Sequence, residues 1–127
     1  MNEIIKYKQL IDDKLYYEAH EVLEALWFPI RKSKNDYSLV LKGFINAAVS
    51  LELFKRNKIE QSKKIHSVYN KYVTDKRIDE IKNDEIFREL KVFIDKKFDL
   101  VHLNNRKREL NISKNSKKKE FKNLRNS

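Results

Sequence analysis

Glycine and proline each occur only once in this chain of 127 residues, as Gly43 and Pro29. Sandwiches, barrels and doubly wound sheets need many turns with φ > 0 or a preset φ, which these two residue types supply. Phosphate-binding loops and dinucleotide fingerprints need several glycines within a few positions. We therefore expect a chain that folds from helices alone, and nucleotide sites of the glycine-rich type are excluded.

The composition fits one small intracellular domain. Because 40% of the residues are apolar and 38% are charged, a modest core lies under a heavily charged surface. The absence of cysteine excludes disulfides, thiolate zinc sites and thiol nucleophiles. The amino-terminal residues do not resemble a signal peptide, and the longest uncharged stretch, residues 43–51, is much shorter than the ~20 residues of a membrane span. We expect a cytoplasmic protein without a membrane segment.

The positive charge is concentrated at the carboxyl end of the chain. The net charge is +10, and residues 104–127 contribute +7 of it through nine basic and two acidic side chains. Few apolar residues follow Leu103, so this segment cannot bury enough surface to offset the entropy of ordering. The sequence predicts a helical domain over residues 1–103 and a basic flexible tail over residues 104–127.

Apolar residues recur at helical spacing and predict five helices with short antiparallel connections. Asp12 or Asp13 is expected to cap the second helix. Pro29 is expected to end that helix, because the residue before a proline avoids the α conformation. Asn35 or Asp36 is the expected cap of the third helix. The five helices are expected at about residues 3–11, 15–28, 37–56, 59–73 and 84–101.

The third predicted helix belongs at the centre of the domain, since it is apolar around most of its circumference. Gly43, Ala47 and Ser50 form a stripe of small side chains along it. Such a stripe lets a neighbouring backbone approach closely. Residues 74–83 are polar, and Ile78 is expected among the side chains that anchor them to the core.

The second predicted helix carries the candidate functional side chains. His20 and Glu24 are one turn apart, within hydrogen-bonding reach of each other. At 100° per residue, Trp27 and Tyr16 lie within about 40° of His20. His20 is therefore expected inside the buried stripe between two aromatic rings, with Glu24 at its border. Asn46, in the middle of the third helix, needs a partner if it is buried, and His20 or Glu24 is the expected one.

Three interpretations of this cluster remain open. The first is a structural hydrogen bond between His20 and Glu24 that fixes helix packing. The second is a metal site on the same two side chains, which needs a further ligand from another helix. Asn46, Glu52 and His66 are the candidates for that ligand. The third is a pocket for a small molecule or a peptide, with the expected lining Tyr16, His20, Glu24, Trp27 and Asn46.

Two stretches of the chain resemble the motifs of domain-of-unknown-function family number 309. Residues 17–24, YEAHEVLE, followed by Trp27, resemble the signature of that family. Residues 41–48, LKGFINAA, resemble its second motif, a glycine followed by Leu-Ile-Gln and alanines. The resemblance covers roughly residues 3–100. It implies a small all-α fold without an assigned activity.

The chain departs from the family's pattern at two positions. The family's motif usually carries Gln where this chain has Asn46, and often His where it has Leu53. The loss of that histidine weakens the metal interpretation for this chain, because it removes the best third ligand beside His20.

Together, the residues and the resemblance lead us to expect a binding or interaction module that uses the His20–Trp27 region. We expect a small-molecule or protein partner, no cofactor and no enzymatic activity. Two alternatives stay open: a metal-dependent hydrolase centred on His20 and Glu24, and binding of nucleic acid by the basic tail. The side chains expected to contact an anionic partner are Arg106, Lys107, Arg108, Lys117, Lys118, Lys119, Lys122 and Arg125.

Overall fold

The computed structural model describes the backbone of residues 2–125 and the side chains of residues 2–111. Within that part of the chain every regular element is a helix, which confirms the predicted all-α fold. The chain divides into two compact units, residues 1–94 and residues 95–127. The elements are α1 (Asn2–Asp12), α2 (Tyr16–Trp27), the 3₁₀ helix η1 (Phe28–Ile30), α3 (Asp36–Lys55), α4 (Ile59–Tyr72), α5 (Asp75–Asp79) and α6 (Asp84–Arg125).

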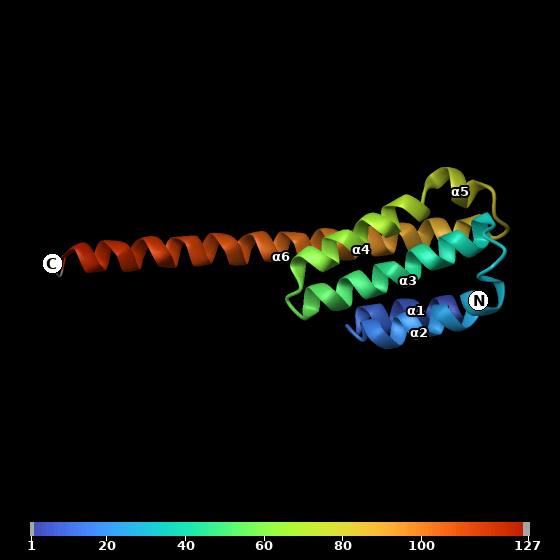
Figure 1. Ribbon diagram of the computed structural model, residues 1–127, viewed down its shortest axis with the longest axis horizontal. Coiled ribbons are helices and arrows are strands. Elements are labelled where there is room, and N and C mark those ends of the chain that lie inside the picture. The colour runs from blue at the N-terminus through green and yellow to red at the C-terminus, as the bar shows by residue number, and fades with distance from the viewer. Residues whose placement is uncertain (1, 126–127) are drawn as a thin grey trace. The chain divides into compact units, whose positions relative to one another are not determined.

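Helix α3 lies at the centre of the first unit, as its sequence predicts. It packs against both α2 and α4, while α1 packs against α2. Successive helices from α1 to α4 run in alternating directions (Figure 1). Among the described residues, α3 is long and apolar enough to qualify as a membrane span by length and composition alone. Buried core helices meet the same criteria, and ten of the 20 residues of α3 are buried.

Four aromatic side chains from four helices meet in the core of the first unit. Tyr7 of α1 is fully buried and donates its hydroxyl to the carbonyl oxygen of Phe44 at 2.7 Å. The ring centroid of Phe44 lies 5.8 Å from that of Tyr69 in α4 and 6.3 Å from that of Phe87 in α6. These large side chains connect helices that are distant in the sequence.

Helices α3 and α4 approach each other along the predicted stripe of small residues. A Cβ atom added to Gly43 would lie 3.2 Å from Cβ of Tyr72 and closer still to Cγ2 of Val73. Further along, Ser50 and Ser62 are buried, and the hydroxyl of each donates to the carbonyl oxygen of the other at 2.7 Å. These reciprocal bonds satisfy both hydroxyls, so the close contact buries no unpaired polar group there.

Several connections between helices contain a residue in the left-handed conformation that is not glycine. Each such residue carries a Cβ atom in a conformation that glycine adopts at no steric cost, and asparagine tolerates it better than lysine does. A chain with one glycine, placed at a helix contact, has to fill these positions with other residues. The positive φ angles are 59° at Lys14, 51° at Lys34, 63° at Asn57 and 62° at Asn83.

The turn between α1 and α2 differs from the expected cap. The amide of Leu15 donates to the carbonyl of Leu10 at 2.9 Å, and that of Lys14 donates to the carbonyl of Ile11 at 3.0 Å. This pair of bonds closes a helix around a left-handed residue. Asp12 is therefore the last residue of α1, and Asp13 belongs to the turn that closes it. The N-cap of α2 is Leu15, which makes no side-chain cap, so the prediction of an aspartate cap is wrong.

The start of α3 agrees with the sequence. Asn35 is extended, with φ −72° and ψ 171°, and its side chain accepts the amide of Ser38 at 2.9 Å. One of the two expected caps is thus confirmed. Helix α2 ends at Trp27, and Pro29 lies in η1 immediately after it.

The polar stretch at residues 74–83 contains a helix that the sequence analysis did not identify. Helix α5 has only five residues, too few for hydrophobic periodicity to reveal it. Thr74 caps this helix by accepting the amide of Arg77 at 3.2 Å. Ile78 is fully buried, as expected of an anchor.

The second unit consists of the remainder of α6, which continues past the predicted end near Val101 to Arg125. Leu100, Leu103 and Leu110 are exposed on this helix. The side chains of residues 112–127 lie outside the described part, so the flexibility of the basic tail stays a prediction.

Candidate functional site

The predicted pair of His20 and Glu24 forms on α2. Atom Nε2 of His20 lies 2.5 Å from Oε2 of Glu24, which confirms the inference from their spacing. His20 is closer to the surface than expected, since 20% of its side chain is exposed, whereas Glu24, with 45% of its side chain exposed, lies at the border of the buried face as expected. The imidazole packs on the ring of Tyr17 at a centroid distance of 5.4 Å. The expectation that it is buried between Tyr16 and Trp27 is wrong.

The orientation of α2 explains this difference. Its buried residues are Tyr16, Ala19 and Leu23, whose common direction is about 70° from that of His20 around the helix axis. His20 therefore lies at the edge of the buried face, and Trp27 is half-buried near the same edge. The apolar residues of α2 span a wide arc around the helix, so the sequence does not show which part of that arc is buried. The centre of the buried face depends on the helices that pack against α2.

Both nitrogens of the His20 ring face protein oxygens. Opposite Glu24, atom Nδ1 lies 3.2 Å from the carbonyl oxygen of Tyr17. Carboxylate and carbonyl oxygens only accept hydrogen bonds, so the ring can donate to both only as imidazolium. A metal ion on either nitrogen would have to displace one of these oxygens. No group of three His, Asp or Glu side chains that could hold a metal ion occurs among the described residues.

A groove of about 320 Å³ lies beside this pair and is open to solvent. Its wall on α2 is formed by aromatic rings, and its opposite wall has two aliphatic side chains, one acid and one base. We call it the α2–α3 groove. It is lined by Tyr16, Tyr17, His20, Val49, Glu52, Leu53 and Arg56.

The structure brings only two of the five expected pocket residues to this groove, namely Tyr16 and His20. Glu24 lines a separate hollow of about 390 Å³ next to Phe28. Asn46 donates its amide to the carbonyl of Lys42 at 2.8 Å. The expected bond from Asn46 to His20 or Glu24 is therefore wrong, because a carbonyl one turn back on its own helix satisfies the amide.

Four groove residues, three on α3 and the fourth at its C-cap, were not identified from the sequence as a set. Val49, Glu52, Leu53 and Arg56 are spaced at i, i+3, i+4 and i+7, which places them on one helical face. That spacing is a readable signal. The spacing was not recognised because apolar residues cover most of the circumference of α3. Only the contact with α2 distinguishes the groove face of α3 from its core face.

The polar groups of the groove are held by one another. Atom Nε of Arg56 donates to Oε1 of Glu52 at 2.9 Å; the Arg56 side chain is 59% exposed and that of Glu52 is 19% exposed. Burial, together with the negative charge of Glu52, raises the pKa of the Tyr16 hydroxyl. On the same ring, Nζ of Lys55 lies 5.9 Å from the centroid and donates to the carbonyl of Lys14 at 3.0 Å.

The other candidate metal ligands lie apart from the pair, with one exception. Glu52 lines the same groove as His20, and so does Leu53, the position at which the related motif often has histidine. His66 stacks on Tyr69 in α4 at a centroid distance of 5.9 Å. A histidine at position 53 would have joined His20 in the groove, whereas His66 belongs to the packing of α4.

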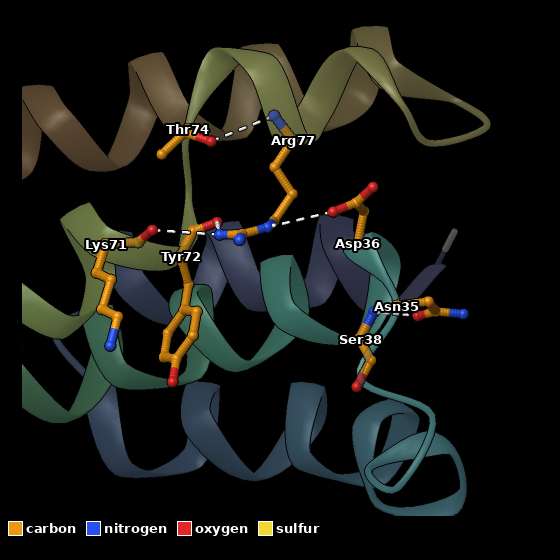
Figure 2. A network of polar contacts seen from close by, with 7 residues as sticks. All are labelled: Asn35, Asp36, Ser38, Lys71, Tyr72, Thr74 and Arg77. Atoms are coloured by element: carbon orange, nitrogen blue, oxygen red, sulfur yellow. Dashed lines mark hydrogen bonds and ion pairs between the residues drawn. The ribbon is translucent and has the colours of Figure 1, made fainter.

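A second polar cluster surrounds Arg77 of α5 (Figure 2). Its Nη1 atom donates to the carbonyls of Tyr72 at 2.9 Å and Lys71 at 3.2 Å, and its Nε atom lies 3.3 Å from Oδ1 of Asp36. Carbonyls at the end of a helix have no partner within it, and a guanidinium satisfies them well. This cluster ties α5 to the end of α4 and the start of α3, so we assign it a structural role.

The basic residues expected to contact an anionic partner are only partly described. Arg106, Lys107 and Arg108 are exposed on α6. The side chains of Lys117, Lys118, Lys119, Lys122 and Arg125 lie outside the described residues.

Comparison with known proteins agrees with the resemblance seen in the sequence. Residues 4–65 match the model of a family described as "Domain of unknown function (DUF309)". The match includes all seven residues of the α2–α3 groove, and it ends before the expected coverage to about residue 100. Neither the curated proteins nor the solved structures contain a significant match.

Proposed function

We propose that the first unit is a binding module whose ligand site is the α2–α3 groove. Residues 4–65, which match the model of the DUF309 family, include every residue of that groove, and the family has no assigned activity. The groove itself carries this proposal. Small-molecule sites are usually concave, mainly apolar and provided with a few polar groups, with volumes from about 300 Å³ upward. The α2–α3 groove has this character and a volume of about 320 Å³.

Three features of the groove favour binding over catalysis. His20, a metal ligand in the hydrolase alternative, has both ring nitrogens against protein oxygens. Glu52 is engaged by Arg56. The remaining lining is aromatic or aliphatic, which favours seating a hydrophobic body. The metal-dependent hydrolase remains the weaker proposal, since His20 and Glu24 supply two ligands and a catalytic zinc site needs three from the protein.

Filling the groove should abolish binding without unfolding the protein. In the full chain we expect Leu53→Trp to occupy the space between α2 and α3, because Leu53 is half-buried on the groove wall. A screen of small aromatic and aliphatic fragments, read by amide chemical shifts in ¹H–¹⁵N spectra, should give shifts around Tyr16 and Leu53 in the wild type. The variant should bind the same fragments at least ~10-fold more weakly.

The control is Ile5→Trp, which adds the same side chain at a residue of α1 that is 66% exposed. It should leave fragment binding unchanged. Fragment shifts that cluster away from the groove, or that persist in Leu53→Trp, would contradict the proposal. His20→Ala and Glu24→Gln should likewise weaken binding with the helical circular dichroism intact, and loss of fold in both would make that pair purely structural.

A second function, binding of nucleic acid, is supported by the exposure of residues 106–108 on α6. Three consecutive basic side chains are about 100° apart around a helix, so they point to different sides. That arrangement fits a helix lying within a groove of a duplex better than one lying on a flat surface. The whole segment from residue 104 onward adds a net charge of +7.

Salt dependence tests this second function. We expect the full chain to bind duplex DNA with a steep loss of affinity as salt rises, because binding releases about 0.9 counterion per phosphate neutralised. Changing residues 106–108 to Gln should reduce the slope of log K against log[salt] by up to about 2.7. Fluorescence anisotropy measures the slope.

The matched control is the triple variant Lys63→Gln, Lys64→Gln and Lys82→Gln, which removes the same charge from exposed positions of the first unit. Equal slopes in the two triple variants would contradict a role for α6.

A further inference from the structure

We infer that the α2–α3 groove selects a small organic acid, whose carboxylate pairs with Arg56 and whose flat apolar body lies between the aromatic wall of α2 and the aliphatic wall of α3. This inference rests on the proposed function and adds the chemical class of the ligand.

Arg56 is held in a position suited to an anion. Its Nε atom donates to Oε1 of Glu52 at 2.9 Å, which restrains the guanidinium at the rim of the groove. Among the described residues, the two terminal amino groups of Arg56 have no protein hydrogen-bond partner. Guanidinium binds carboxylate through parallel hydrogen bonds from one edge of its planar fork. An edge of Arg56 that includes both terminal nitrogens is therefore available for a carboxylate.

The neighbouring charges favour an anion over a cation. Glu52 is the one carboxylate that lines the groove, and Arg56 already engages it. Glu24 lines a different hollow and pairs with His20. A second cation, Lys55, stands 5.9 Å from the centre of the Tyr16 ring. An amine ligand would have to compete with Arg56 for Glu52, whereas a carboxylate meets a cation with unused donors.

The walls of the groove fit a flat hydrocarbon body. Tyr16 and Tyr17 present rings from α2, and Val49 and Leu53 present branched side chains from α3. Aromatic rings prefer offset or edge contacts with other rings, and they pack well against aliphatic surfaces. The Tyr16 hydroxyl is neutral at neutral pH, as in any tyrosine, so it places no negative charge beside the bound acid. An aryl or branched alkyl acid satisfies both walls and the rim together.

Three probes of one size and different charge test the inference on the full chain: 3-phenylpropionate, 3-phenylpropanol and 3-phenylpropylamine. Amide chemical shifts at Tyr16 and Leu53 report binding in the groove. For the acid we expect a Kd of about 1 mM, the scale set by ligands of this size. The alcohol should bind at least ~5-fold more weakly, and the amine more weakly still.

Two variants separate a carboxylate contact from general attraction to a basic protein. Arg56→Gln should weaken the acid by about 10-fold and the alcohol by less than about 2-fold, since a charged hydrogen bond is lost only with the acid. Glu52→Gln keeps the shape of the side chain and removes a negative charge beside Arg56, so the acid should bind more tightly. Lys64→Gln, at an exposed position of α4, controls for net charge and should change none of the affinities.

The outcomes distinguish this inference from the proposed function. Tighter binding of the amine, equal binding of all three probes, or an Arg56→Gln variant that still prefers the acid would overturn the organic-acid assignment while leaving the groove as a ligand site. If no probe shifts the groove residues, both the assignment and the proposed function fail.

Discussion

Gly43→Leu should destabilise the first unit by at least about 3 kcal/mol, because α3 and α4 touch at this residue. Even a single Cβ atom at Gly43 would lie 3.2 Å from Cβ of Tyr72 and closer still to Cγ2 of Val73, a buried and stiff β-branched side chain. Overpacking a core by a few atoms costs about 1–3 kcal/mol, and a leucine adds more than the contact can absorb. Urea unfolding followed by circular dichroism at 222 nm measures the loss.

Gly43→Ala provides a sharper version of the same experiment. In an open helix this change stabilises by about 1 kcal/mol, because alanine has the higher helix propensity. Here we expect net destabilisation, since the added methyl group meets Val73. In a Val73→Ala background the clashing methyl is absent, so Gly43→Ala should cost less there than in the wild type. Ala25→Leu, on the exposed face of α2, is the control and should stay within about 0.5 kcal/mol. Additive effects of Gly43→Ala and Val73→Ala would contradict a direct contact.

The close contact of α3 and α4 also shows what the sequence can reveal of this fold. A long helix that is apolar on most sides and carries a stripe of small residues can only be central and closely packed, and both expectations hold. The cap at Asn35 follows from local chemistry, because its side chain bonds an amide three residues on. These features depend on residues close together in the chain.

The turn at Lys14 could not be predicted in the same way. Aspartates before a helix usually indicate an N-cap. At this turn the backbone bonds of the preceding helix extend to Leu15, so Asp12 ends α1 and Asp13 lies in the turn that follows it. An aspartate N-cap for α2 and a backbone-bonded end for α1 were both compatible with the local sequence. The placement of α2 against α1 determined that the second one formed.

The candidate site divides along the same line. The contact between His20 and Glu24 lies within one turn of α2 and was predictable. The groove beside it depends on the rotation of α2 against α3, which brings Leu53 and Arg56 next to His20. Asn46 found a carbonyl on its own helix. A single sequence predicts which residues share a face of a helix. It does not predict how two helices are placed against each other, and a groove between them depends on that placement.

Tyr7→Ala should cost about 3–5 kcal/mol of unfolding free energy, and Tyr7→Phe about 1 kcal/mol. Tyr7 is fully buried, and its hydroxyl joins α1 to the carbonyl of Phe44 at 2.7 Å. The alanine variant loses the packing of a large ring and leaves a cavity between α1 and α3. The phenylalanine variant keeps the ring and loses only the hydrogen bond. Urea unfolding at pH 7 separates the two contributions, and equal losses in both variants would contradict the dominance of packing.

The same pair of proteins should behave differently in alkali. Burial raises the pKa of Tyr7 far above the value of about 10 for an unfolded tyrosine. The resulting stability is fully present below pH 10, and it is lost as the pH rises from there toward the folded-state pKa, because only the unfolded chain releases this proton. The slope approaches about 1.4 kcal/mol per pH unit. Tyr7→Phe lacks this loss, so its deficit of about 1 kcal/mol at pH 7 should vanish or reverse near pH 11.

Tyr16 and Tyr37 also have raised pKa values from burial, and they act equally in both proteins. The difference in unfolding free energy between wild type and Tyr7→Phe, measured from pH 8 to pH 11, therefore isolates Tyr7; a constant difference over that range would show that its hydroxyl ionises as readily in the folded protein as in the unfolded chain.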